Sequence, residues 1–505
     1  MLAVESLLLF GSVLFLSSLF ATKAGTRFGV PALLVFLFVG MIFGSAGFGI
    51  QFKNYDLAQT IGTVALCIIL FSGGLDTIYK DIKPVVKQGI TLATAGVLFT
   101  ALFTGVFIYY AVNFWFANIT ISFFESMLLA SVMSSTDSAS VFAILRGKSV
   151  RLKNNLKPML ELESGSNDPM AYMLTVVFIQ LITSGQHDTE YGSAIISFLL
   201  QFIIGIGAGY LLGKIAVFVI NKINLDNNSF YPILLLTCCL FIFSVTYFME
   251  GNGFLAVYPA GLVIGNGKIV HKKASMKVFD GLSWISQILV FLTLGLLVNP
   301  SEMWPVAIVS LLIGAFIIFG SRPLSVLISL LPFRQTPFRD KIFVSWVGLK
   351  GAVPIIFALF PLVVGLENSH FIFNVVFFIT LMSLLLQGTS LTKVAKLLHL
   401  SDTEEYKSEF TDFRMDIEFH EEVMSTMIEL KLTDNMLKNG NMLKDLHVPE
   451  HTLVVMVKRN GKYLVPKGDT IMMKDDVLLI ITTDENSLLE AYESMGITDY
   501  RLKRN

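Results

Sequence analysis

Long apolar stretches recur along the first 400 residues, with short polar segments between them. A helix needs about 20 apolar residues to cross the hydrocarbon core of a bilayer, which is ~30 Å thick. The stretches that meet this length lie at approximately 4–21, 29–48, 57–75, 89–112, 122–145, 157–183, 193–219, 231–248, 254–268, 280–298, 303–329, 340–362 and 370–396. The pattern therefore predicts an α-helical polytopic membrane protein with about thirteen transmembrane helices.

The end of the chain follows a different pattern. Short β-type runs, separated by Gly and Asp, predict strands at 426–432, 452–458, 463–466 and 477–483. Helical pieces are expected at 441–446 and 485–494. We therefore divide the chain into a transmembrane domain, residues 1–400, and a small α+β domain, residues 401–505.

Composition supports this division. Only 15% of the residues are charged and 54% are hydrophobic, whereas about 25% of the residues in soluble proteins are charged. The charged residues are dense only after residue 400, and the net charge of −1 gives no indication of nucleic-acid binding. Cys67, Cys238 and Cys239 lie in apolar runs without metal-binding spacing, so they are expected to be small buried residues, and no cofactor is expected.

Lys and Arg are concentrated in alternate loops between the predicted helices. Numbered from the N-terminus, the even loops contain only Lys53, and the remaining basic loop residues lie in the odd loops. Because basic loops stay in the cytoplasm, the N-terminus is predicted to lie outside and the C-terminal domain in the cytoplasm. The expected location is the cell (inner) membrane.

Ionisable residues lie inside several predicted helices, where a charge at the bilayer centre costs at least ~2.5–3.5 kcal/mol. These residues are Asp137, Glu163, Asp168, Arg322 and Lys350. Intramembrane charges commonly mark ion pathways, so each of these residues is a candidate functional residue.

Predicted helices 5 and 12 carry the features of interrupted helices. Helix 5 contains the string SSTDSAS at 134–140, whose side chains compete with the backbone for hydrogen bonds. Helix 12 contains Gly348, Gly351 and Pro354. Two interrupted helices, seven apart and opposite in direction, are typical of an inverted-topology repeat, and Lys350 would compensate the carbonyl-rich ends at the breaks. The structural alternatives are a Ser-rich packing face and a Pro kink without function.

Predicted helix 6 arranges its polar residues in two ridges. Residues four apart share a face of a helix, so Glu163 lies with Asn167 and Ser164 lies with Asp168. An unpaired Glu163 in lipid would be costly, and Arg322 is the available cationic partner. The alternative is that Arg322 extends to the cytoplasmic interface.

The strings SSTDSAS, LESGSNDP, SRPLSV and VGLKGAVPI, in this order, resemble the cation:proton antiporter superfamily. Within its first branch, the resemblance is to sodium- or potassium/proton antiporters of the NhaP type, and it covers roughly residues 5–398. It implies thirteen helices with inverted repeats, crossed broken helices 5 and 12, alternating access, and a homodimer in the lipid bilayer.

The resemblance also implies three groups of site residues. The ion- and proton-binding group consists of Asp168, Asp137, Thr136 and Ser164, with the alkali cation at Asp168, Thr136 and Ser164. The structural ion pair and its support consist of Glu163, Asn167 and Arg322. The broken helix 12 contributes Lys350, Gly348 and Gly351, and Lys350 departs from the more common Arg of the family.

The physical account of transport is competition for one site. A dehydrated alkali cation requires hard oxygen ligands, which the ion-binding group and the unwound backbone would supply. Asp168 then carries either a proton or a cation. With Glu163 held by Arg322 and Asn167 in place of a second titrating Asp, one carboxylate changes state per cycle, which predicts electroneutral exchange.

The C-terminal segment MLKNGNMLKDLHVPEHTLVVMVKRNGKYLVPKGDTIMMKDDVLLIITT resembles the TrkA-C domain, the C-terminal half of the regulator-of-potassium-conductance (RCK-C) domain. The segment contains no G-x-G-x-x-G, so NAD binding is not expected. The resemblance implies dimerisation and binding of a small regulatory ligand, with cyclic di-AMP as a candidate. A purely structural dimerisation cap is the alternative.

We therefore expect a secondary transporter, not an enzyme, that exchanges K+ in preference to Na+ for H+ and serves pH homeostasis. The preference for K+ rests on the association of TrkA-C domains with potassium systems. A Na+/H+ antiporter is the alternative. A ligand-gated potassium channel is more remote, because the sequence lacks a T-V-G-Y-G-like filter. It also lacks the H-E-x-x-H and G-x-S-x-G motifs of hydrolases.

Overall fold

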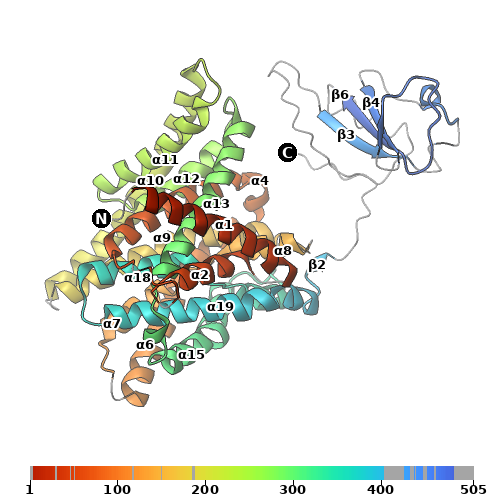
Figure 1. Cartoon of the computed structure of the whole chain (residues 1–505). Helices are drawn as coiled ribbons and strands as arrows, with labels where there is room; N and C mark the ends of the chain where they lie inside the picture. The colour runs from red at the N-terminus through yellow and green to blue at the C-terminus, as the bar shows by residue number, and fades with distance from the viewer. Residues whose placement is uncertain are drawn as a thin grey trace. The chain divides into compact units, whose positions relative to one another are not determined.

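The structure of the 505-residue chain is a computed structural model. It describes residues 4–28, 31–45, 47–50, 52–116, 119–148, 150–184, 188–402, 426–432, 437, 440–446, 452–459 and 462–482. The chain divides into two compact units, residues 1–402 and 403–505. Figure 1 shows an assembly of helices in the first unit and a small sheet in the second.

Helices make up almost all of the first unit. In chain order they are α1 (Val4–Phe28), α2 (Ala32–Phe43), α3 (Tyr55–Asp76), α4 (Tyr79–Ile82), η1 (Lys83–Val85), α5 (Val86–Thr91), η2 (Leu92–Gly96), α6 (Val97–Trp115), α7 (Phe123–Val132), α8 (Ser138–Gly147), α9 (Leu156–Thr183), α10 (Asp188–Lys222), α11 (Phe230–Phe248), α12 (Gly253–Asn266), α13 (Lys272–Leu297), α14 (Pro300–Met303), α15 (Ala307–Phe316), η3 (Ile317–Ser321), α16 (Arg322–Ser329), α17 (Phe338–Trp346), α18 (Ala352–Val364) and α19 (Ser369–Leu397). The segments η2 and η3 are π-helical, and the sequence pattern does not predict them.

The predicted helical membrane architecture is confirmed. Seven helices of the described part are long and apolar enough to cross a membrane, namely Tyr55–Asp76, Tyr79–Trp115, Gly192–Lys222, Phe230–Phe248, Lys272–Leu297, Ala307–Ser329 and Ser369–Leu397. Shorter apolar helices lie at Leu8–Lys23, Ala32–Phe43, Phe123–Val132, Gly253–Asn266 and Ala352–Val364. The number of thirteen spans stays a prediction.

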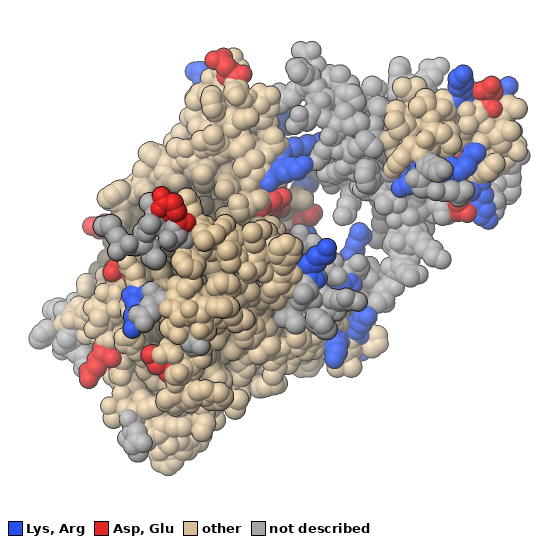
Figure 2. All heavy atoms as spheres, viewed as in Figure 1, with Lys and Arg blue, Asp and Glu red and all other residues tan. Residues whose placement is uncertain are grey.

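Large apolar side chains cover the outside of this unit. Phe114, Phe248 and Trp304 are 82%, 84% and 79% exposed. On the face shown in Figure 2, broad areas of the helical unit carry neither basic nor acidic side chains. An apolar surface of this extent would make a soluble protein aggregate, but it suits helices surrounded by lipid.

Two helices of the first unit are interrupted, as predicted. Residues 133–137 separate α7 from α8, and residues 347–351 separate α17 from α18. In the first break the hydroxyl of Ser134 donates to the carbonyl oxygen of Ser131 at 2.6 Å, so a side chain takes a carbonyl that a continuous helix would use. The alternative of a Ser-rich face on a continuous helix is therefore wrong.

Glycines bring α3 and α12 into close contact. A Cβ atom at Gly74 would overlap the carbonyl oxygen of Tyr258, and a Cβ atom at Gly261 would meet that of Phe71. Small residues at a helix interface let the two backbones approach each other, which maximises van der Waals contact within a membrane.

Two short strands connect the end of the first unit to the loop between α8 and α9. Strand β1 (Arg151–Leu152) pairs antiparallel with β2 (Ser401–Asp402). In the same loop, the side-chain amide of Asn154 donates to the carboxylate of Asp340 at 3.2 Å, in the first turn of α17. The chain therefore leaves the first unit beside the start of α9.

The second unit contains an antiparallel sheet with strand order β3-β6-β4-β5 (Figure 1). Its strands are β3 (Thr426–Lys431), β4 (Thr452–Arg459), β5 (Lys462–Leu464) and β6 (Val477–Thr482), so the four predicted strands are confirmed. The predicted helical piece 441–446 is a single 3₁₀ turn, η4 (Leu443–Asp445), and the predicted helix 485–494 lies outside the described residues.

The core of the second unit is small. It consists of the buried residues Leu432, Leu446, Val457, Met472, Leu478 and Ile480. At its edge, Arg459 donates to both carboxylate oxygens of Asp476, at 2.9 and 2.6 Å, and these bonds raise the pKa of Arg459. The pair joins the end of β4 to the turn before β6.

Replacement of Gly74 by Ala is expected to lower the thermal midpoint of the purified protein. The added methyl group would meet the backbone of α12, an overpacking cost of ~1–3 kcal/mol. Gly73→Ala is the matched control, since nothing lies within 4 Å of a Cβ atom there. Scanning fluorimetry in detergent compares the two variants, and equal midpoints would contradict the close helix contact.

Candidate functional site

The two interrupted helices meet at their breaks. The backbone N–H of Asp137, in the first break, donates to the carbonyl oxygen of Leu349, in the second, at 2.8 Å. A Cβ atom at Gly351 would overlap the carboxylate of Asp137, so the approach requires glycine at that position. This hydrogen bond thus satisfies one backbone N–H in the first break and one carbonyl in the second.

Lys350 lies buried at this junction, with 1% of its surface exposed. Its Nζ atom donates to the carbonyl oxygen of Ser135 at 2.9 Å. That carbonyl belongs to the unwound segment after α7, where carbonyl groups lack helical partners and carry partial negative charge. Lys350 therefore places a positive charge at the carbonyl-rich end of α7.

Asp168 faces the first break from α9. The hydroxyl of Ser135 donates to Oδ1 of Asp168 at 2.7 Å, and Asp168 is 6% exposed. Among the described residues, Oδ2 of Asp168 accepts no hydrogen bond. Ser135 thus links the two opposite charges, because its carbonyl accepts from Lys350 and its hydroxyl donates to Asp168.

Ser164 and Asn167, also on α9, contact the next residue of the break. The hydroxyl of Ser164 donates to the carbonyl oxygen of Thr136 at 2.8 Å and accepts from the N–H of Ser138 at 3.1 Å. The side-chain amide of Asn167 donates to the hydroxyl oxygen of Thr136 at 2.5 Å. The predicted residues Thr136, Ser164 and Asp168 are therefore brought together at one side of the break.

Asp137 has a different local role in this structure. Its carboxylate accepts from both the N–H and the hydroxyl of Ser140, three residues further on. This is the geometry of an N-cap for α8. One carboxylate oxygen caps the helix and the other accepts the hydroxyl of Ser140. Direct ion binding by Asp137 stays a prediction.

Glu163 and Arg322 form an ion pair inside the helical unit. The two side chains are 2% and 3% exposed, so Arg322 does not extend to the interface. Arg322 opens α16 directly after the π-helical segment η3, and a Cβ atom at Gly348 would lie 2.9 Å from its Nε atom. Asn167 supports Thr136 rather than this pair.

Sequence reasoning did not single out three residues that hold the site. Ser135 stands in the quoted string SSTDSAS, but its contact with Asp168 depends on how the backbone unwinds. Ser383 and Gln387 lie on α19, and Ser383 accepts from the N–H of Lys350 at 3.0 Å. Two polar residues four apart, on one face of a predicted transmembrane helix, are a signal that could have identified them.

The site offers oxygen atoms for a cation and a buried carboxylate for a proton. The carboxylate of Asp168 and the hydroxyls of Ser135, Thr136 and Ser164 are hard ligands of the kind that alkali cations prefer. The chemistry available is exchange of one positive charge for another at a site shielded from water.

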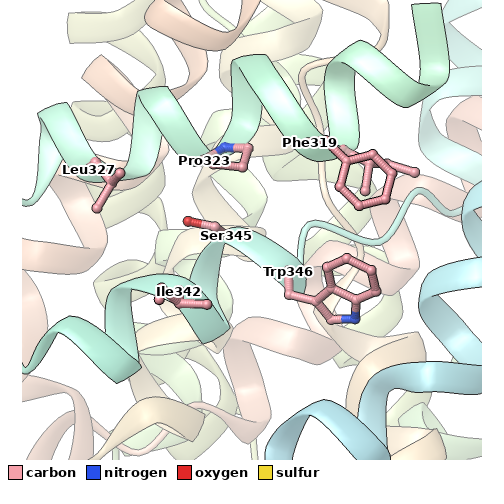
Figure 3. A pocket seen from close by; sticks show the side chains of 7 residues that line it. Phe319, Pro323, Leu327, Ile342, Ser345 and Trp346 are labelled. Atoms are coloured by element: carbon pink, nitrogen blue, oxygen red, sulfur yellow. The ribbon is translucent and has the colours of Figure 1, made fainter. Parts of the chain in front are cut away.

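A separate cavity of about 140 Å³ lies between η3–α16 and α17. Figure 3 shows Phe319, Pro323 and Leu327 on one side and Ile342, Ser345 and Trp346 on the other. None of the candidate ion-binding residues lines this cavity. The cavity is therefore separate from the candidate site.

Both parts of the chain match known protein families. The family model described as sodium/hydrogen exchanger, transmembrane, matches residues 12–397, and that of the TrkA-C domain matches residues 432–496. A K(+)/H(+) antiporter NhaP from Alkalimonas amylolytica is 39% identical over 95% of this chain and 81% of its own length. A K(+)/H(+) antiporter NhaP2 from Shewanella sp. (strain ANA-3) is 35% identical over 98% of this chain and 83% of its own length.

A solved structure shares the helical fold. The sodium proton antiporter MjNhaP1 from Methanocaldococcus jannaschii, at pH 8, superposes with a TM-score of 0.67 and 23% sequence identity. The match covers 78% of this chain and 99% of that protein.

Replacement of Arg322 by Met is expected to destabilise the protein by ~3–5 kcal/mol, because Glu163 is left as a buried charge without its partner. The double variant Glu163→Gln/Arg322→Met should recover most of this loss, since it removes both charges. Size-exclusion chromatography of heated samples gives the two thermal midpoints. A single variant as stable as the double variant would contradict the ion pair.

Proposed function

Because the chain belongs to the sodium/hydrogen exchanger family, we propose that it exchanges K+ for H+ across the cell (inner) membrane by alternating access. The observation that carries this proposal is the buried carboxylate of Asp168 beside an unwound helix. A single carboxylate in such a place binds a proton or a cation, but not both at once.

The preference for K+ is supported by relatives and by domain composition. The relatives with 35–39% identity are named K(+)/H(+) antiporters, and the chain carries a TrkA-C domain. Na+/H+ exchange is the second candidate, because a more distant relative, 28% identical over 68% of this chain, is named a probable Na(+)/H(+) antiporter.

We propose that the cation binds between the break of α7–α8 and α9. Asp168, Thr136 and Ser164 are the ligands assigned to it, together with carbonyl groups of the unwound segment. Ser135, which already donates to Asp168, joins this set. In the proton-loaded state the carboxylate of Asp168 carries the hydrogen, and arrival of the cation releases it. Only the loaded states change access from one side of the membrane to the other.

One-for-one exchange follows from the charges around this carboxylate. Arg322 holds Glu163 in an ion pair, and Asn167 has no titrating group. Lys350 donates to the carbonyl oxygen of Ser135, and in this proposal its charge stays constant through the cycle. Asp168 is then the group that changes its charge, which makes each cycle electroneutral.

The C-terminal unit is proposed to lie in the cytoplasm, with the N-terminus outside, because of the distribution of basic loops. Its TrkA-C match supports a regulatory role in a homodimer, with a small ligand such as cyclic di-AMP as effector. A structural dimerisation cap without a ligand is the alternative. Titration of the purified protein with cyclic di-AMP in a calorimeter distinguishes the two.

Replacement of Asp168 by Asn is expected to abolish exchange, because the side chain keeps its size but loses its charge. Everted vesicles with a pH-sensitive dye report exchange, titrated separately with K+, Na+ and Li+. The unmodified protein should respond to K+ at lower concentrations than to Na+. Asp56→Asn, at an exposed position in the first turn of α3, is the control. Normal exchange by Asp168→Asn would reject the site assignment.

Steady-state exchange is expected to be independent of membrane potential. Moving one net charge across a potential of 100 mV changes the free energy by about 2.3 kcal/mol. This change would shift an electrogenic equilibrium roughly fiftyfold. The exchange flux is measured in proteoliposomes with an imposed membrane potential that is not set by a K+ gradient. A clear dependence of flux on voltage would reject one-for-one exchange, and unitary current steps would indicate a channel instead.

A further inference from the structure

Two buried polar residues on α19 face the break between α17 and α18. Ser383 and Gln387 are 1% and 2% exposed, and they lie four residues apart on one face of the helix. The helix α19 packs against both α17 and α18, so it contacts both sides of the interruption. Neither side chain belongs to the proposed cation ligands.

Their hydrogen bonds satisfy two backbone groups at the break. The N–H of Lys350 donates to the hydroxyl of Ser383 at 3.0 Å, and that hydroxyl donates to Oε1 of Gln387 at 2.5 Å. The amide of Gln387 donates in turn to the carbonyl oxygen of Trp346 at 2.8 Å. Trp346 ends α17, so its carbonyl is one that the helix leaves without an internal partner.

The same bonds continue to the candidate site. Lys350 receives its backbone anchor from Ser383, and its ammonium group donates to the carbonyl oxygen of Ser135 at 2.9 Å. The hydroxyl of Ser135 donates to Asp168 at 2.7 Å. Hydrogen bonds, linked through Lys350 and Ser135, therefore connect Gln387 on α19 to the carboxylate on α9.

We propose that Ser383 and Gln387 are positioning residues that set the cation affinity of the transporter. They fix the backbone at Lys350, which fixes the ammonium group against Ser135, and Ser135 in turn orients its hydroxyl at Asp168. The inference rests on the proposed function, since it concerns the affinity of that same site. It adds a third helix, α19, to the two interrupted helices and α9.

The arrangement differs from ordinary helix packing. Thr380, one turn before Ser383 on α19, is also fully buried, but its hydroxyl has no hydrogen-bond partner among the described residues. Burial of a hydroxyl on this helix therefore does not by itself create a connection to the break. Thr380 provides a matched control for the effect of removing a buried hydroxyl.

The test is a comparison of KM and maximal rate for K+ in proteoliposomes. Ser383→Ala removes the acceptor for the N–H of Lys350, and Gln387→Met removes the donor to Trp346 at similar volume. Each should raise KM about fivefold, the size of a typical net hydrogen-bond contribution, with the maximal rate within about twofold. Ser383→Thr keeps the hydroxyl and should restore KM. The double variant should raise KM no more than either single variant, because all act through Lys350.

The control and a second readout separate positioning from folding. Thr380→Val should leave KM unchanged, and a KM as high as that of Ser383→Ala would overturn the proposal. An unchanged KM in Ser383→Ala would also overturn it. K+ binding should raise the Tm of the purified protein, so the K+ dependence of Tm reports the same affinity without transport. The same rise in Tm should need a higher K+ concentration in the variants. If Ser383→Ala does not fold, Ser383→Cys keeps the volume with a weaker acceptor and should show the same direction.

If the unmodified protein binds K+ in the thermal assay but shows no exchange, the proposed function fails while the positioning role is still measured. If exchange is normal and neither KM nor the K+ dependence of Tm changes in the variants, the positioning role fails alone. The two failures are therefore distinct.

Discussion

Backbone groups that leave a helix inside a membrane must find partners within the protein, because lipid provides none. This constraint determines the arrangement at the two breaks. The hydrogen bond from Asp137 to Leu349 satisfies one group in each break, and Lys350 satisfies the carbonyl of Ser135 with a positive charge. The unwound segments are therefore fixed by each other and by the neighbouring helices. A fixed unwound segment can hold polar atoms at the depth of the membrane where a cation must shed its water.

The buried charges are divided between two roles. Glu163 and Arg322 neutralise each other away from the first break, and replacing either alone would leave a costly buried charge. Asp168 has no such ion pair among the described residues and accepts one hydrogen bond from Ser135. Two carboxylates on one helix, five residues apart, thus differ in their surroundings rather than in their chemistry. In the proposed cycle, this difference lets Asp168 change its charge while Glu163 stays paired with Arg322.

Sequence reasoning predicts the parts of this structure that depend on local pattern. Polar residues in SSTDSAS and glycines in GLKG locate both breaks, and β-type runs locate the four strands of the second unit. The cost of a buried charge also predicts the Glu163–Arg322 pair and the place of Lys350 at the breaks. Other contacts between distant segments are not predicted, because periodicity identifies a face of a helix but not its neighbour. The contacts of Ser135, Ser383 and Gln387, and the capping role of Asp137, depend on the unwound backbone. The π-helical segment η3, directly before Arg322, likewise has no sequence signal.

The pairing of β1 with β2 fixes the end of the first unit to the loop before α9. Residue 403, the first of the second unit, directly follows β2, and β2 pairs with the loop that precedes α9. Asn154 joins that same loop to Asp340 at the start of α17. A displacement of β2 would therefore be transmitted through β1 to the loop before α9, and through Asn154 to the first turn of α17.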